Sequence, residues 1–251
     1  MKVSLNKITK KGKALYLAYD QGLEHGPSTD FNDKNVDPNY IINIAQKGKF
    51  QGIVFQKGIA EKYNSEIKKS KIPLIIKLNG KTSLYKGEAI ARQLCTVKEA
   101  ISLGAKAIGY TIYIGSSHES LMMHEFEKIE EEAHAKGLPI ILWVYPRGKG
   151  IKSDTSKEIM SYASRVGLEL GADIIKIKYG GNPDDLKWAV KSAGKTKVVV
   201  AGGPPALESA LLKQTSDIIK AGAIGLAVGR NLWQNPKPFD LTKKIQKIIW
   251  K

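Results

Sequence analysis

Residues 172–180, with the sequence A-D-I-I-K-I-K-Y-G, form an apolar run typical of a buried β-strand, yet the run contains two lysines. Side chains in a strand alternate between two faces, so Lys176 and Lys178 are expected on one face and Ile175 and Ile177 on the other. Parallel strands covered by helices are normally apolar on both faces, so two cations on one face indicate a polar, enclosed region at the strand end. Burial and a neighbouring positive charge both lower the pKa of a lysine, which makes the neutral, nucleophilic amine available. The stretch therefore suggests a Schiff-base lysine in a buried parallel strand. Taken alone, it is better explained by two lysines that flank the strand end and reach solvent, so the choice depends on the rest of the chain.

The rest of the chain repeats this unit, a short apolar run followed by an amphipathic segment. Eight runs are predicted strands: residues 14–19, 52–56, 73–78, 105–113, 139–145, 172–179, 197–201 and 223–228. Eight strand–helix units of about 31 residues account for the 251 residues, which predicts a TIM (β/α)8 barrel, one domain over residues 1–251. An open doubly wound sheet would carry a G-x-G-x-x-G turn after its first strand, and the sequence has none there.

Helix boundaries are visible in the sequence between these strands. The pairs Thr96 with Glu99 and Thr155 with Glu158 match the capping box, and Asn182 precedes a proline and two acidic residues. Glycines that end a helical pattern and precede a strand are expected in the left-handed conformation: Gly104, Gly137, Gly171 and Gly222.

Charge, hydropathy and cysteine content indicate which partners and which cellular compartment to expect. The net charge of +16 raises the question of nucleic acid, but the lysines are spread over every predicted helix and no recognition motif is present, so no nucleic-acid partner is expected. The sequence shows neither a signal peptide nor an apolar run of about 20 residues, so we expect no membrane association. Cys95 is the single cysteine, which fits the reducing cytoplasm.

Polar residues follow the predicted strands where each apolar run stops, and in a barrel the carboxyl ends of the strands carry the active site. Asp20 and His25 follow the first strand, and Trp143, Tyr145 and Arg147 share one face at the end of the fifth. Buried core aromatics are the structural alternative for Trp143 and Tyr145. Lys176 on the next strand favours a catalytic site.

The ends of the seventh and eighth strands are rich in glycine, at the place where this kind of barrel usually binds phosphate. The candidate phosphate-binding residues are Gly202, Gly203, Gly229 and Arg230. Glycine lets backbone N–H groups approach an anion closely, and arginine adds a bidentate donor. A simple turn is the alternative for either glycine group alone.

A metal site is not expected. Only His25 lies at the predicted mouth, because His118, His124 and His134 fall in or near one helical segment and are better explained as surface residues. We expect no metal and no cofactor.

Eight sequence blocks taken together resemble the archaeal-type class I fructose-1,6-bisphosphate aldolases, and the resemblance runs from end to end. The blocks are A-Y-D-Q-G-L-E-H-G-P (18–27), F-Q-K-G-I-A-E-K-Y (55–63), K-L-N-G-K-T (77–82), G-Y-T-I-Y (109–113), W-V-Y-P-R-G (143–148), K-I-K-Y (176–179), A-G-G-P (201–204) and A-V-G-R-N (227–231). The chain departs from the family pattern at Gln21, where many members have histidine, and at Pro205, where relatives often carry lysine or threonine.

The resemblance implies a Schiff base on Lys176, with Tyr145 as the acid/base residue, Asp20 supporting proton transfer and Trp143 shaping the site. It also implies that a phosphorylated sugar is bound at Gly202, Gly203, Gly229 and Arg230, with His25, Arg147 and Lys178 nearby. It further implies a cytoplasmic enzyme of glycolysis or gluconeogenesis that forms a homo-oligomer, commonly a decamer.

Two alternatives remain at this point. One is a 2-amino-3,7-dideoxy-threo-hept-6-ulosonate synthase on the same scaffold, against which Trp143 and Glu24-His25 argue. The other is a non-catalytic sugar-phosphate-binding barrel, which the joint presence of Lys176, Tyr145 and Asp20 disfavours.

Overall fold

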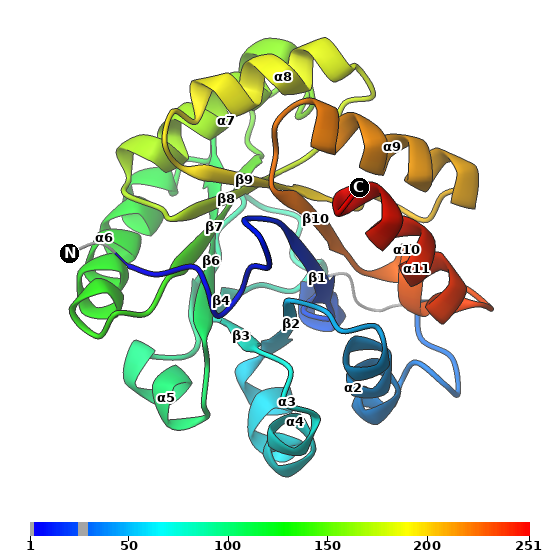
Figure 1. The fold of residues 1–251 in the computed structure, drawn as a ribbon. Helices are drawn as coiled ribbons and strands as arrows, with labels where there is room; N and C mark the ends of the chain where they lie inside the picture. Colours follow the sequence, from blue (N-terminus) through cyan, green and yellow to red (C-terminus); the bar gives the residue numbers. More distant parts are fainter. Residues whose placement is uncertain (1–2, 25–29) are drawn as a thin grey trace.

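The structure, a computed structural model, describes residues 3–24 and 30–251 and shows eight parallel strands closed into a barrel (Figure 1). The barrel strands are β1 (Ala14–Ala18), β2 (Gly52–Gln56), β3 (Leu74–Lys77), β6 (Ala107–Ile114), β7 (Ile140–Pro146), β8 (Ile174–Ile177), β9 (Lys197–Ala201) and β10 (Gly225–Val228). They follow one another in the order β1-β10-β9-β8-β7-β6-β3-β2, and β1 pairs with both β10 and β2. The predicted TIM barrel is therefore confirmed.

Helices surround the barrel and cover the outer face of the strands (Figure 1). They are α1 (Gln21–Glu24), α2 (Pro38–Lys47), α3 (Lys57–Lys62), α4 (Asn64–Ser70), α5 (Val97–Ser102), α6 (Glu119–Ala135), α7 (Lys157–Glu169), α8 (Pro183–Ser192), α9 (Glu208–Lys220), α10 (Arg230–Trp233) and α11 (Pro238–Ile249). A small antiparallel ribbon of β4 (Asn79–Gly80) and β5 (Arg92–Gln93) follows β3. Within the described ranges, no helix has the length and apolar character needed to cross a membrane.

The alternation of side chains along the strands divides the core into two layers. One cluster, which includes Tyr16, Ile75, Ile141, Trp143 and Val199, fills the interior of the barrel. A larger cluster lies between the outer face of the strands and the helices. Because successive residues alternate between these layers, the last inward side chain of each strand faces the barrel mouth.

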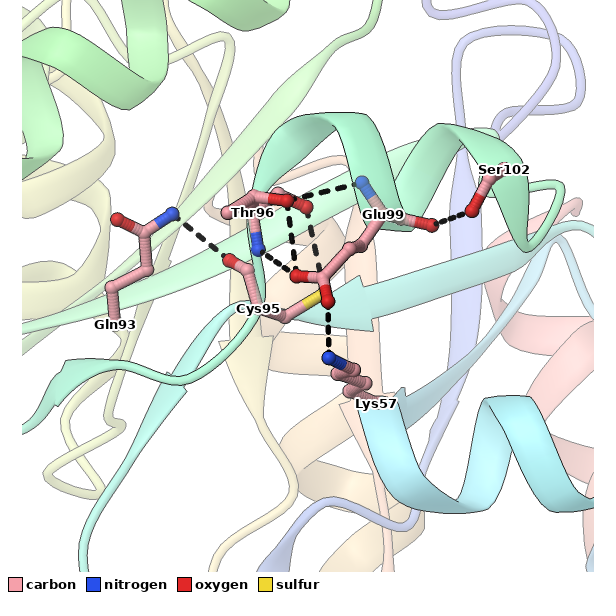
Figure 2. Close-up of polar contacts among 6 residues, drawn as sticks. All are labelled: Lys57, Gln93, Cys95, Thr96, Glu99 and Ser102. Atoms are coloured by element: carbon pink, nitrogen blue, oxygen red, sulfur yellow. Dashed lines mark hydrogen bonds and ion pairs between the residues drawn. The ribbon is translucent and has the colours of Figure 1, made fainter.

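The predicted helix ends are confirmed with one exception. Thr96 and Glu99 form a complete capping box at the start of α5, and Glu99 also pairs with Lys57 at the start of α3, which joins two neighbouring helix termini (Figure 2). The hydrogen bond from Lys57, followed by those from Thr96, lowers the pKa of Glu99 to about 2. The capping box predicted at Thr155 is wrong: the hydroxyl of Ser156 accepts from the Ile159 N–H, so α7 begins one residue later than that prediction requires.

The cap predicted at Asn182 and the predicted left-handed glycines are both confirmed. Asn182 caps α8 through the Asp184 N–H. The glycines predicted to be left-handed all have positive φ: Gly104, Gly137, Gly171 and Gly222.

Candidate active site

A cavity of about 710 Å³ opens at the carboxyl ends of β1, β7, β8, β9 and β10. All of the predicted site residues that the structure describes line this cavity: Asp20, Trp143, Tyr145, Arg147, Lys176, Lys178, Gly202, Gly203, Gly229 and Arg230. The remaining predicted residue, His25, lies outside the described residues.

Lys176 lies on the inward face of β8, where it is level with Trp143 of β7 and Val199 of β9. Its side chain is almost completely buried, at 6% exposure, and its Nζ lies 4.8 Å from the centroid of the Trp143 indole ring. No carboxylate among the described residues forms an ion pair with it. The Lys176 side chain therefore lines the cavity with its amine in cation–π contact with Trp143.

The pKa of Lys176 is lowered from 10.5 to about 8, chiefly by burial. The charge of Asp20 acts to raise this pKa, the positive charge of Lys77 contributes to lowering it, and Glu24 acts to raise it. Lys178 was expected to be the neighbouring positive charge that lowers this pKa. That expectation is wrong, because the ammonium that acts on Lys176 belongs to Lys77 of β3. Near pH 8 a substantial fraction of the Lys176 amine is uncharged and able to attack a carbonyl.

The lowered pKa of Lys176 also predicts a cost in stability. In the unfolded chain this lysine has its ordinary pKa of 10.5, so at pH values below about 8 folding must bury a charged amine that water would solvate better. We expect Lys176→Met to raise the free energy of unfolding at pH 7, by at most roughly 3 kcal/mol. The gain should shrink as the pH rises from about 8 toward 10.5, because the unfolded lysine then also loses its proton. Denaturant titrations of both proteins across that range measure it, and a variant less stable at pH 7 would contradict the prediction.

Lys77 is a site residue that the sequence argument did not identify. It ends β3 with the same inward parity as Ile75, is fully buried, and its Nζ lies 2.6 Å from Glu24 Oε1 and 3.8 Å from Asp20 Oδ2. Its Nζ also lies 5.5 Å from the centroid of the Trp143 ring. Burial of an ammonium is costly unless a carboxylate lies beside it, and Lys77, Glu24 and Asp20 form one such charged cluster beside Lys176. The sequence feature that could have identified Lys77 is its position as the last residue of the apolar run L-I-I-K, on the inward face.

Trp143 and Tyr145 come from the inward face of β7. Gly109 of β6 makes room for the indole, because a side chain there would begin 2.2 Å from the Trp143 ring. Tyr145 is paired in register with Tyr113, and burial, with the charges of Asp20 and Glu24, raises its pKa well above 10. The Tyr145 hydroxyl therefore keeps its proton at neutral pH and can donate it within the cavity.

Arg147 and Lys178 lie further out. The Arg147 guanidinium carbon is 5.0 Å from the centroid of the Tyr113 ring. Lys178 was predicted to lie within the strand, but β8 ends at Ile177 and Lys178 lies beyond it. The Lys178 ammonium forms an ion pair with Asp154, between β7 and α7, and lies 5.8 Å from the centroid of the Tyr145 ring. Lys178 is thus a partly exposed cation at the rim, and Lys176 is the buried lysine of the pair.

The glycine segment after β9 is held by Asn231, which follows β10 and had no predicted role. The Asn231 amide donates to the carbonyls of Gly202 at 2.9 Å and Pro204 at 2.7 Å, and its oxygen accepts from the Ala206 N–H. Gly203 has φ of 75°, a conformation that favours glycine.

The N–H of Gly202 donates to the carbonyl of Ala227 at 2.9 Å. This N–H is therefore already used within the barrel wall, and Gly202 could donate it to an anion only by giving up that bond.

The histidines do not build a metal site in the described part of the chain, where no group of three or more histidine, cysteine, aspartate or glutamate residues could hold an ion. His118 precedes α6 as its N-cap and His124 lies within the helix, and both are exposed, as predicted. His134 is less exposed than predicted: its ring lies 2.7 Å from Glu130 Oε1 and 2.9 Å from Asp173 Oδ2, which ties α6 to the segment before β8.

Comparison with known proteins agrees with this geometry. The model of the DeoC/LacD family of aldolases matches residues 14–235. The chain is 47% identical to the fructose-bisphosphate aldolase class 1 of Thermoproteus tenax, over 98% of this chain and 93% of that protein. It is 41% identical to the fructose-bisphosphate aldolase class 1 of Halobacterium salinarum, over 97% of this chain and 92% of that protein.

A solved structure of an archaeal fructose-1,6-bisphosphate aldolase, whose catalytic lysine is covalently bound to the carbinolamine intermediate of the substrate, superimposes with a TM-score of 0.93. The two chains are 45% identical, and the match covers 98% of each. These similarities confirm the resemblance that the eight sequence blocks indicated, and the chain belongs to the DeoC/LacD family of aldolases.

Proposed function

We propose that this chain is a class I aldolase that reversibly cleaves fructose 1,6-bisphosphate into dihydroxyacetone phosphate and glyceraldehyde 3-phosphate. The observation that carries the proposal is the buried Lys176 amine, whose pKa is lowered to about 8 and which lines one cavity with Asp20 and Tyr145. The relatives named as class 1 fructose-bisphosphate aldolases support the choice of substrate.

The chemistry begins when the uncharged Lys176 amine attacks the C2 carbonyl of the ketose and forms a carbinolamine. Loss of water gives an iminium, which accepts the electron pair released when the C3–C4 bond breaks and becomes an enamine. The C4 hydroxyl loses its proton as the aldehyde leaves. Protonation of the enamine at C3 and hydrolysis then release dihydroxyacetone phosphate and the free lysine.

Tyr145 is the residue to which we assign these proton transfers. Its hydroxyl has a strongly raised pKa, so it is present as a proton donor, and it lies in the same cavity as Lys176. Asp20 supports it, since the Asp20 charge acts on both Tyr145 and Lys176. Trp143 limits the position of the amine through its ring.

The cations and glycines at the mouth are assigned to the substrate phosphates. Arg147, Lys178 and Arg230 supply positive charge. Gly203 and Gly229 have no side chain, so a phosphate can come close to the backbone there. Gly202 also lines this part of the cavity, but its N–H already donates to the Ala227 carbonyl. A role for His25 stays a prediction.

We expect Arg230→Ala chiefly to raise KM for fructose 1,6-bisphosphate. The Arg230 side chain is only 21% exposed, so loss of its charge-assisted contact with the substrate phosphate should reduce kcat/KM by roughly 10- to 100-fold. Steady-state kinetics measure the effect, with Arg165→Ala as the control, because Arg165 pairs with Glu169 on the surface of α7. Kinetics like those of the unmodified protein would remove Arg230 from the phosphate site.

Reduction with borohydride in the presence of dihydroxyacetone phosphate tests the proposed function against a non-catalytic sugar-phosphate-binding barrel. A Schiff-base enzyme should be inactivated and gain the mass of the reduced adduct. A binding protein should release its ligand unchanged. The 2-amino-3,7-dideoxy-threo-hept-6-ulosonate synthase would also form an adduct, so cleavage of fructose 1,6-bisphosphate is measured beside it.

The wider setting follows from the resemblance and from the composition. We infer a single-domain enzyme over residues 1–251 that works in the cytoplasm, in glycolysis or gluconeogenesis, without a metal, cofactor or nucleic-acid partner. We also infer a homo-oligomer, a decamer by resemblance to the family, which light scattering on the purified protein would test.

A further inference from the structure

Two of the candidate phosphate-binding cations already hold a carboxylate. The Lys178 ammonium pairs with Asp154, and Arg230 Nη1 lies 3.3 Å from Asp30 Oδ2. A substrate phosphate that approaches either cation meets a negative charge already paired with it. The two pairs differ in how the carboxylate is held, and this difference determines what each pair does when phosphate binds.

Asp154 lies on the wall of the cavity and is held loosely. Its side chain is 38% exposed, it belongs to the segment between β7 and α7, and within the described residues its carboxylate contacts the Lys178 ammonium. The segment is seated against the end of β8 by its backbone: a side chain at Gly180 would begin 2.4 Å from the Thr155 carbonyl oxygen. The Asp154 carboxylate can therefore turn toward solvent by side-chain rotation while the backbone beside Lys178 stays in place.

Asp30 is held firmly. Its side chain is 18% exposed, and its backbone carbonyl accepts hydrogen bonds from Gln234 Nε2 at 2.9 Å and from the buried Asn35 Nδ2 at 3.1 Å. Arginine offers several N–H donors in a fixed plane, so Arg230 can keep Asp30 on one edge and still bind phosphate with another.

We propose that the Asp154 carboxylate is a built-in substitute for substrate phosphate at Lys178, which an incoming phosphate displaces, whereas Asp30 remains on Arg230 and orients it. The inference rests on the proposed function, which supplies the phosphorylated substrate. Asp154 is then a determinant of specificity. An unphosphorylated sugar has no charge with which to replace the carboxylate, so the Lys178–Asp154 ion pair stays intact and Lys178 does not bind that sugar.

Equilibrium binding of inorganic phosphate, measured by titration calorimetry, tests the inference on the full-length protein. Removing the competing charge with Asp154→Asn should lower the Kd for phosphate by about two- to fivefold, the range expected for a partly exposed ion pair. Asp30→Asn is the matched control, because it removes the same charge from the other pair and should leave the Kd unchanged or raise it. In a Lys178→Met background, Asp154→Asn should have no effect on phosphate binding, because the two residues act through one contact.

Three results would overturn the inference: a Kd that Asp154→Asn leaves unchanged or raises, an equal decrease in both aspartate variants, or a decrease that persists without Lys178. The second would show a general effect of net charge instead of displacement. Borohydride trapping with dihydroxyacetone phosphate is run on the same proteins. Absence of an adduct in the unmodified protein would count against the proposed function, whereas a normal adduct with an unaltered phosphate Kd would count against the role of Asp154 alone.

Discussion

Lys176→Met should abolish both turnover and the borohydride adduct. Without the amine no iminium can form, and the electrons of the breaking C3–C4 bond have no acceptor, so we expect cleavage of fructose 1,6-bisphosphate to fall by at least about 10⁴-fold. The buried position of Lys176 beside Trp143 makes methionine a suitable replacement, since it fills a similar volume without a charge. Cleavage assays and mass spectrometry of the borohydride-treated protein measure the two effects.

Lys178→Met is the matched control. Because Lys178 lies beyond β8 at the rim and pairs with Asp154, its variant should still form the adduct and should chiefly bind phosphate more weakly. The pH dependence of trapping should stay close to that of the unmodified protein, since Lys77 is the cation that acts on Lys176. Peptide mapping identifies the modified residue, and an adduct on Lys178 or Lys77 in the unmodified protein would disprove the assignment.

Tyr145→Phe should have the second largest effect, a reduction in kcat of roughly 10²- to 10⁴-fold, the range typical of a lost general acid or base. The side chain keeps its shape and loses only the hydroxyl, whose pKa burial holds well above 10. Exchange of the C3 protons of dihydroxyacetone phosphate with deuterated water isolates the proton transfer, and it should slow in parallel with kcat.

Tyr113→Phe provides the comparison for this variant. Tyr113 is the register partner of Tyr145 on β6 and also has a raised pKa, but it is fully buried and does not line the cavity. Its loss should change kcat by less than about tenfold. Equal losses in both variants, or an exchange rate that Tyr145→Phe does not change, would remove Tyr145 from the proton transfers.

The sequence by itself determined the barrel and placed at its mouth Lys176 and Tyr145, the two residues to which we assign the chemistry. Alternation of short apolar runs with capped amphipathic segments is a local signal, because hydrogen bonding and side-chain periodicity act over a few residues. The position of Lys176 and Tyr145 in the cavity could be predicted because each is an inward residue near the carboxyl end of such a run. The family blocks added the roles that the pattern alone left open.

Only the tertiary structure decided which charges meet. Lys77 and Glu24 are 53 residues apart, and their ion pair exists because closure of the barrel brings the ends of β1 and β3 to one mouth. The strand signal extended past the real end of β8, so the position of Lys178 and its pairing with Asp154 were not visible. The shared N–H of Gly202 also depends on a neighbouring strand. Burial, charge pairing and hydrogen-bond satisfaction depend on register across the barrel, and no short stretch of sequence contains that register.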